Sequence, residues 1–189
     1  MRFTPLVAGA LSAAFFAGAA VLFFAHLTGL WVWAAFVGWA SYDQSGADRR
    51  ALFTSSVCMV FGVVMAWLVA LVVAAGVTGL PSTPASALAA ALASFLIVCA
   101  SRYEALSNVP ATFYGFASTF AFLLLSSQAL SIDSLTHWDF GNALVCIPIS
   151  LLIGSALGVA HQRLAFFLTA VENRTAPGSV RLTPAAGKD

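Results

Sequence analysis

The sequence predicts an all-α, polytopic membrane protein in which six transmembrane helices form two inverted three-helix repeats. The first observation is composition: 61% of the 189 residues are hydrophobic and 8% are charged, which is more apolar surface than a soluble globule of this size can bury. The second is a short aromatic motif that occurs twice. The third is a set of basic residues confined to alternate connections. Together these observations indicate a duplicated membrane domain.

Six apolar segments are candidate transmembrane spans, because about 20 apolar residues cross about 30 Å of hydrocarbon. They are residues 5–25, 30–42, 51–77, 85–101, 109–125 and 143–160. The second and fifth are short central helices, and a helix over 30–42 reaches only about 20 Å. We expect one domain over residues 1–170, with repeats at about 5–78 and 84–168. A polar, disordered cytoplasmic tail is expected over 171–189.

The repeated motif lies in the two short segments. AAFVGWAS at 34–41 returns 77 positions later as ATFYGFAS at 111–118. The segments that follow match at a larger offset of 92, which aligns Ala51, Leu52 and Gly62 with Ala143, Leu144 and Gly154. The second repeat therefore carries about 15 additional residues, mostly within 126–140.

The placement of charge predicts the orientation in the membrane. If the N-terminus is cytoplasmic and every segment crosses, the inner connections and the tail contain all eight basic residues: Arg2, Arg49, Arg50, Arg102, Arg163, Arg174, Arg181 and Lys188. The outer connections contain Asp133 and Asp139 but no Lys or Arg, in agreement with the positive-inside rule. Because each repeat crosses three times, the two halves are inverted, as in transporters whose substrate path lies near the midplane.

Small and hydroxyl-bearing residues share one face of each short segment, at spacings of three and four residues. The candidate pore-lining residues are Gly38, Ser41, Asn108, Thr112, Gly115, Ser118 and Thr119. Asn108 is also placed to cap its helix. The aromatic neighbours that would limit solute size are Phe36, Trp39, Phe113, Tyr114 and Phe116. Small residues also let helices approach closely, so helix packing alone is an alternative explanation of the stripe.

Further small residues indicate close helix packing in the third and sixth spans. They are Gly62, Ala66, Ser150, Gly154 and Gly158. We expect the two helices to pack against each other or against their own short helices, and a homo-oligomer contact would use the same chemistry. Trp31, Trp33 and Trp138 fall at the outer ends of the spans, a position typical of interfacial anchors.

Several classes of function lack the residues that they need. No Asp, Glu, Lys or Arg lies at the centre of a predicted span, which disfavours proton-coupled pumping. His26, His137 and His161 have no partner at ligand spacing, so we expect no metal site. The sequence has no phosphate-binding loop, no nucleophile motif and no basic patch interleaved with aromatic residues. We therefore expect no enzyme, no cofactor and no nucleic-acid partner.

The stretch VPATFYG at 109–115, continued by TFA at 119–121, resembles the YcdZ-like inner-membrane proteins, the family of domain of unknown function 1097. The tryptophan and glycine of segment 33–38 resemble an earlier motif of that family, and Gly154 and Gly158 resemble its last helix. The resemblance covers residues 7–160. It implies a multi-pass protein of the bacterial inner (plasma) membrane, and together with the charge bias it places both termini in the cytoplasm.

The sequence therefore favours a passive channel or facilitator for a small, uncharged polar solute. Hydroxyl groups and exposed carbonyls of the short helices would exchange hydrogen bonds with the solute, and the aromatic residues would set its size. The alternative is a non-transporting membrane scaffold that binds other helices through its glycine faces. The expected partners are the lipid bilayer, a small polar solute and a second copy of the chain.

Overall fold

The computed structural model describes residues 4–126 and 128–175. Within these residues the chain forms α-helices and a single 3-10 turn, η1 (Glu104–Leu106), and no strand. The helices are α1 (Pro5–Phe24), α2 (Val32–Gln44), α3 (Arg49–Ala74), α4 (Ser82–Ala100), α5 (Val109–Leu125), α6 (Ile132–Thr136) and α7 (Ala143–Thr175). The short helix α6 was not predicted, and α7 continues into the first residues of the expected tail. The tail beyond Thr175 lies outside the described residues.

Four helices are long and apolar enough to cross a membrane: α1, α3, α4 and α7. The 17-residue α5 is apolar but shorter, and α2 has 13 residues. Large apolar side chains point away from the protein on the outer helices. Phe15 of α1 is 62% exposed and Phe95 of α4 is 65% exposed. Such surfaces are stable where lipid chains cover them, so the chain is a helical membrane protein.

Polar caps begin the helices at one end of the molecule. The carboxylate of Asp48 accepts a hydrogen bond of 2.6 Å from the backbone N–H of Ala51, at the start of α3. The amide oxygen of Asn108 accepts one of 3.2 Å from Ala111 at the start of α5, which confirms the predicted cap. These side chains satisfy N–H groups that the first turn leaves unpaired.

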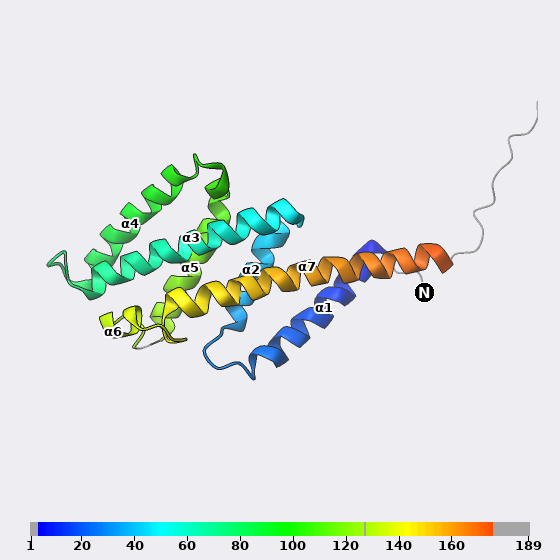
Figure 1. The fold of residues 1–189 in the computed structure, drawn as a ribbon, viewed down its shortest axis with the longest axis horizontal. Coiled ribbons are helices and arrows are strands. Elements are labelled where there is room, and N and C mark those ends of the chain that lie inside the picture. Colours follow the sequence, from blue (N-terminus) through cyan, green and yellow to red (C-terminus); the bar gives the residue numbers. More distant parts are fainter. Residues whose placement is uncertain (1–3, 127, 176–189) are drawn as a thin grey trace, which may run out of the picture.

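The two short helices lie at the centre of the molecule. Figure 1 shows α2 and α5 between the long helices α3 and α7, with α4 beside α3 and α1 beside α7. The principal packing partner of α2 is α7, and that of α5 is α3. Each short helix of one sequence repeat therefore packs on the long helix of the other repeat. The long helices α3 and α7 also touch each other, as expected, but this exchange of partners was not anticipated.

A buried apolar cluster fills the space between α3, α5 and α7. Its fully buried members include Met59, Ile147 and Leu151. Trp31 and Trp33 pack against this cluster, and their indole N–H groups are enclosed by protein. These two side chains, predicted as interfacial anchors, therefore pack against the core, whereas the third predicted anchor, Trp138, is 83% exposed.

Candidate functional site

The glycines of the repeated motif lie in close helix contacts. A Cβ atom on Gly38 of α2 would lie 1.9 Å from the carbonyl oxygen of Leu151 in α7. A Cβ atom on Gly115 of α5 would lie 1.9 Å from the carbonyl oxygen of Met59 in α3. No residue larger than glycine fits at either position without separating the helices.

Glycines of the long helices α7 and α3 make equivalent close contacts with the short helices. A Cβ atom on Gly154 would lie 1.7 Å from the carbonyl oxygen of Ala35, and one on Gly62 would lie 1.9 Å from that of Thr112. In the sequence repeat Gly154 aligns with Gly62, and Ala35 aligns with Thr112. The α2–α7 and α5–α3 contacts are therefore equivalent, and each is closed by two reciprocal glycines.

The remaining small residues singled out for packing lie in the same interfaces. Ser150 accepts a hydrogen bond of 3.0 Å from the backbone N–H of Trp31. A Cβ atom on Gly158 would lie 2.7 Å from the ring of Tyr42. Ala66 is fully buried in a second apolar cluster that contains Phe116.

The hydroxyl groups of the stripe bond mainly within their own helices. Thr119 donates a hydrogen bond of 3.0 Å to the carbonyl of Gly115, and Thr112 donates one of 3.3 Å to that of Asn108. Ser118 is buried, and the buried hydroxyl of Ser41 has no hydrogen-bond partner among the described residues. These contacts are typical of hydroxyls inside membrane helices.

The aromatic residues of the motif divide between the two sides of the molecule. Trp39 contacts His161 of α7 in a tilted arrangement with 5.2 Å between ring centroids, and Phe36 lies beside Trp39. Phe113 and Phe116 pack with the α3–α4 pair. Tyr114 instead connects the two short helices, because its hydroxyl donates a hydrogen bond to the side chain of Gln44 at the end of α2.

A polar cleft of about 380 Å³ opens where α5 begins. We call it the Asn108 cleft. Its polar lining residues are Ser45, Asp48, Arg50, Thr54, Ser107 and Asn108. The amide nitrogen of Asn108 donates a hydrogen bond of 2.7 Å to the hydroxyl of Ser45, which links α5 to the end of α2. Of the predicted pore-lining residues, Asn108 alone lines a cleft described here.

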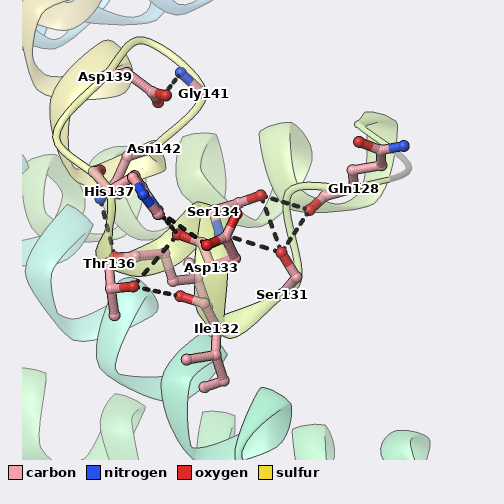
Figure 2. Close-up of polar contacts among 11 residues, drawn as sticks. Gln128, Ser131, Ile132, Asp133, Ser134, Thr136, His137, Asp139, Gly141 and Asn142 are labelled. Atoms are coloured by element: carbon pink, nitrogen blue, oxygen red, sulfur yellow. Dashed lines mark hydrogen bonds and ion pairs between the residues drawn. The ribbon is translucent and has the colours of Figure 1, made fainter.

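A second cleft of about 490 Å³ opens where α5 ends. We call it the Trp31 cleft. Its lining residues include Trp31, Phe122, Ser126, Gln128, Ser134 and Gly141. Figure 2 shows the turn around α6 that forms part of its wall, where the hydroxyl of Ser134 donates a hydrogen bond of 2.9 Å to the carbonyl of Gln128. The rings of Trp31 and Phe122 meet at 5.6 Å between centroids.

The two clefts lie at opposite ends of the short-helix pair. The 17 residues of α5 that separate them span about 25 Å. The hydrogen bond between Tyr114 and Gln44 lies toward the Asn108 cleft. The contact between Trp31 and Phe122 lies toward the Trp31 cleft. The apolar cluster that includes Met59 packs between α3, α5 and α7. The structure therefore describes two polar clefts with closed packing between them.

The two ends differ in charge. Arg49, Arg50, Arg102 and Arg163 lie at the Asn108 end, and Arg50 forms an exposed ion pair of 2.9 Å with Glu104. The turn at the other end contains Asp133, Asp139 and His137 (Figure 2). A hydrogen bond from the His137 ring to the carbonyl of Asp133 raises the pKa of His137, and the Asp133 carboxylate 3.1 Å away raises it further.

Residues 4–126 and 128–175 contain no group of three or more His, Cys, Asp or Glu that could hold a metal ion. Each cleft is lined by residues that are distant in the sequence. Asn108 beside Pro110 was the only local sequence pattern that pointed to either cleft. The Trp31 cleft depends on the unpredicted helix α6.

Comparison with known proteins agrees with the resemblance of the motif. The model of one family, described as "Protein of unknown function (DUF1097)", matches residues 10–166. No curated protein and no solved structure matches the chain. Since the family match covers most of the sequence and all of the helices α2 to α6, the chain belongs to the DUF1097 family.

Proposed function

We propose that the protein is a passive facilitator for a small, uncharged polar solute, and that the structure corresponds to its closed state. The observation that carries this proposal is the pair of polar clefts at opposite ends of α2 and α5. A solute path along these two helices would join the clefts. On this proposal the Asn108 end faces the cytoplasm of a bacterium, together with both termini.

The chemistry of the clefts supports an uncharged solute. Hydroxyl and amide groups of Ser45, Asn108, Ser126 and Ser134 can exchange hydrogen bonds with a solute that leaves water. The sequence has no Asp, Glu, Lys or Arg at the centre of a predicted span, where an ion-coupled transporter usually needs one. A solute such as urea or a small polyol fits this combination.

An inverted-repeat architecture supports a movement that opens the path. The four glycine contacts form two pairs that the sequence repeat aligns with each other. The short helix of each repeat packs on the long helix of the other repeat. In transporters with inverted repeats, one half rocks against the other around a central site. Here such a movement would separate Tyr114 from Gln44 at one end and Trp31 from Phe122 at the other.

Flux into proteoliposomes tests the proposal. Stopped-flow light scattering with urea, glycerol and water should show a permeability above that of empty liposomes for at least one of them. Tyr114→Ala and Phe122→Ala remove the side chains that close the two ends and should raise it. Phe95→Ala, on the lipid-facing surface of α4, is the matched control and should leave it unchanged. Permeability equal to empty liposomes for all proteins and solutes would reject a facilitator.

A second candidate function is a membrane scaffold that does not transport. The specific observation in its favour is the dry packing of Gly38, Thr112, Gly115 and Thr119, all of which were candidate pore-lining residues. A scaffold would co-purify with one membrane partner, or with a second copy of itself, in fixed stoichiometry. A fixed partner together with absent solute flux would favour this function over facilitation.

A further inference from the structure

A third cleft, of about 800 Å³, opens beside the bundle between α2, α3 and α7. We call it the Arg49–Arg163 cleft after the two arginines that line it. Arg49 is the first residue of α3, and Arg163 lies on α7. Both side chains therefore lie where apolar helices leave the hydrocarbon, at the depth of lipid headgroups.

The two arginines are available to an anion. Among the described residues neither forms an ion pair, whereas the neighbouring Arg50 is paired with Glu104. Asp48 also lines the cleft, but its carboxylate accepts a hydrogen bond from the backbone N–H of Ala51, and Asp43 accepts one of 3.2 Å from Gln162. Two guanidinium groups on separate helices can bind the oxygens of one phosphate through several N–H donors.

The rest of the lining combines three polar residues, Tyr42, Asp48 and Gln162, with the apolar residues Ala47, Leu52, Val159 and Phe166. Leu52 and Val159 are half-buried in the cleft, and Phe166 is 76% exposed at its edge. A ligand with a phosphate at one end and hydrocarbon at the other would satisfy both parts of the lining. A phospholipid has this character, and the cleft opens on the surface that lipids cover.

The sequence repeat shows that the equivalent position is filled in the other half. There, Leu71 and Ala74 of α3 replace Arg163 and Phe166. They pack around Leu135 of α6, which is fully buried. Trp67 and Asn142 donate hydrogen bonds of 3.0 and 2.9 Å to the carbonyl of Leu135 and fix it there.

Figure 2 shows the hydrogen bonds that hold this turn, including the cap of α6 by Ser131. The additional residues of the second repeat therefore close with protein a cleft that stays open in the first repeat. In the open copy, the counterpart of Leu71 is the cationic Arg163, and the counterpart of Ala74 is the apolar Phe166.

We propose that the Arg49–Arg163 cleft binds the phosphate of an anionic phospholipid, with its acyl chains along Leu52, Val159 and Phe166. A soluble phosphate ester shares the anionic chemistry but not the chains. The lipid would occupy in the first repeat the place that α6 occupies in the second, and would support the α2–α7 contact from the membrane side.

Native mass spectrometry of the full chain in detergent tests the proposal. Dioleoylphosphatidylglycerol should bind more tightly than dioleoylphosphatidylcholine. The double variant Arg49→Gln/Arg163→Gln should weaken the anionic lipid about 25-fold, or about fivefold for each arginine. Arg50→Gln/Arg102→Gln removes the same charge at the same end of the protein and should leave the affinity unchanged. The arginines are exposed, and thermal unfolding of each variant checks that it folds.

Three results would overturn the assignment. Equal binding of the two lipids by the wild-type protein would exclude recognition of the anionic headgroup. Equal weakening in both double variants would indicate general surface charge instead of a site. Displacement of phosphatidylglycerol by millimolar inorganic phosphate would assign the arginines to a soluble anion.

Discussion

Glycine at four positions sets the distance between the short and the long helices. At these positions the facing atom is a backbone carbonyl oxygen less than 2 Å from where a Cβ atom would lie, so no side-chain rotation can relieve a clash. The close approach brings extended backbone surfaces into contact, which is how membrane helices associate without a hydrophobic drive between them.

Gly154→Ala should therefore destabilise the protein by about 1–3 kcal/mol, the usual cost of overpacking. Gly18→Ala is the matched control, because the Cβ atom at Gly18 of α1 would meet nothing within 4 Å. Since alanine favours helix, the control should be neutral or slightly stabilising. Thermal unfolding in detergent followed by circular dichroism measures both. A Tm for Gly154→Ala equal to that of the control would contradict the packing described.

His137 gives the α6 turn a pH dependence. Its pKa is raised in the folded protein by the Asp133 carbonyl and then by the Asp133 carboxylate. Stabilisation by the protonated ring is therefore complete below the unfolded pKa of about 6.5, and is lost as pH rises through the higher folded pKa. Hydrogen exchange of the α6 peptide, corrected for intrinsic rates, should accelerate over this interval. His137→Gln should remove the acceleration, and its persistence in that variant would assign the effect to another group.

At the level of elements, α6 serves as a plug. Its five residues include Leu135, which belongs to the buried apolar cluster, and the carbonyl of Leu135 accepts hydrogen bonds from Trp67 of α3 and from Asn142, just before α7. The helix is too short to be stable alone, so burial of Leu135 must hold it in place.

Leu135→Ala should destabilise the protein by about 2–5 kcal/mol, because Leu135 is fully buried and the change leaves a cavity. Ile132→Ala on the same helix is the control, since Ile132 is 43% exposed and little should change. Chemical or thermal unfolding of the two variants makes the comparison. Similar losses of stability would mean that α6 does not act as a plug.

The sequence predicts where the apolar helices lie along the chain, but it does not predict which helices pack together. Hydropathy locates α1, α3, α4 and α5 because each is a continuous apolar run between polar caps or turns. The repeat aligns Gly38 with Gly115 and Gly62 with Gly154. Small residues at these positions are compatible with helix contacts within one repeat and with contacts between the two repeats. Only the packed structure shows that the contacts are exchanged.

Two further features lay beyond sequence reasoning for physical reasons. The segment IDSLT of α6 is too short to show a helical period. Trp31 and Trp33 lie at the start of a helix, where an interfacial anchor and a core side chain have the same local pattern, and only the structure shows that they pack against the buried apolar cluster. Two glycines of the candidate pore stripe, Gly38 and Gly115, meet another helix in this structure.

At the level of the whole molecule, the proposed inverted architecture makes a prediction about sidedness. Single cysteines at Thr28, Ser107 and Ser134, in a background with Cys99→Ala, report on the ends of α2 and α5. If both short helices cross the membrane, an impermeant maleimide should label positions 28 and 134 from outside intact cells. It should label position 107 only after lysis. Labelling of positions 107 and 134 from the same side would show that α5 does not cross.

The central claim is that a solute passes between the clefts only when α2 and α5 separate. Ser45 and Asn108 connect the two helices at the Asn108 cleft, with 2.7 Å between their polar atoms. In proteoliposomes of Ser45→Cys/Asn108→Cys, we expect urea flux above that of empty liposomes. The flux should fall on linking the cysteines with a short bifunctional thiosulfonate, and return on reduction. Urea flux that equals that of empty liposomes before linking, or that is unaltered by linking, would contradict it.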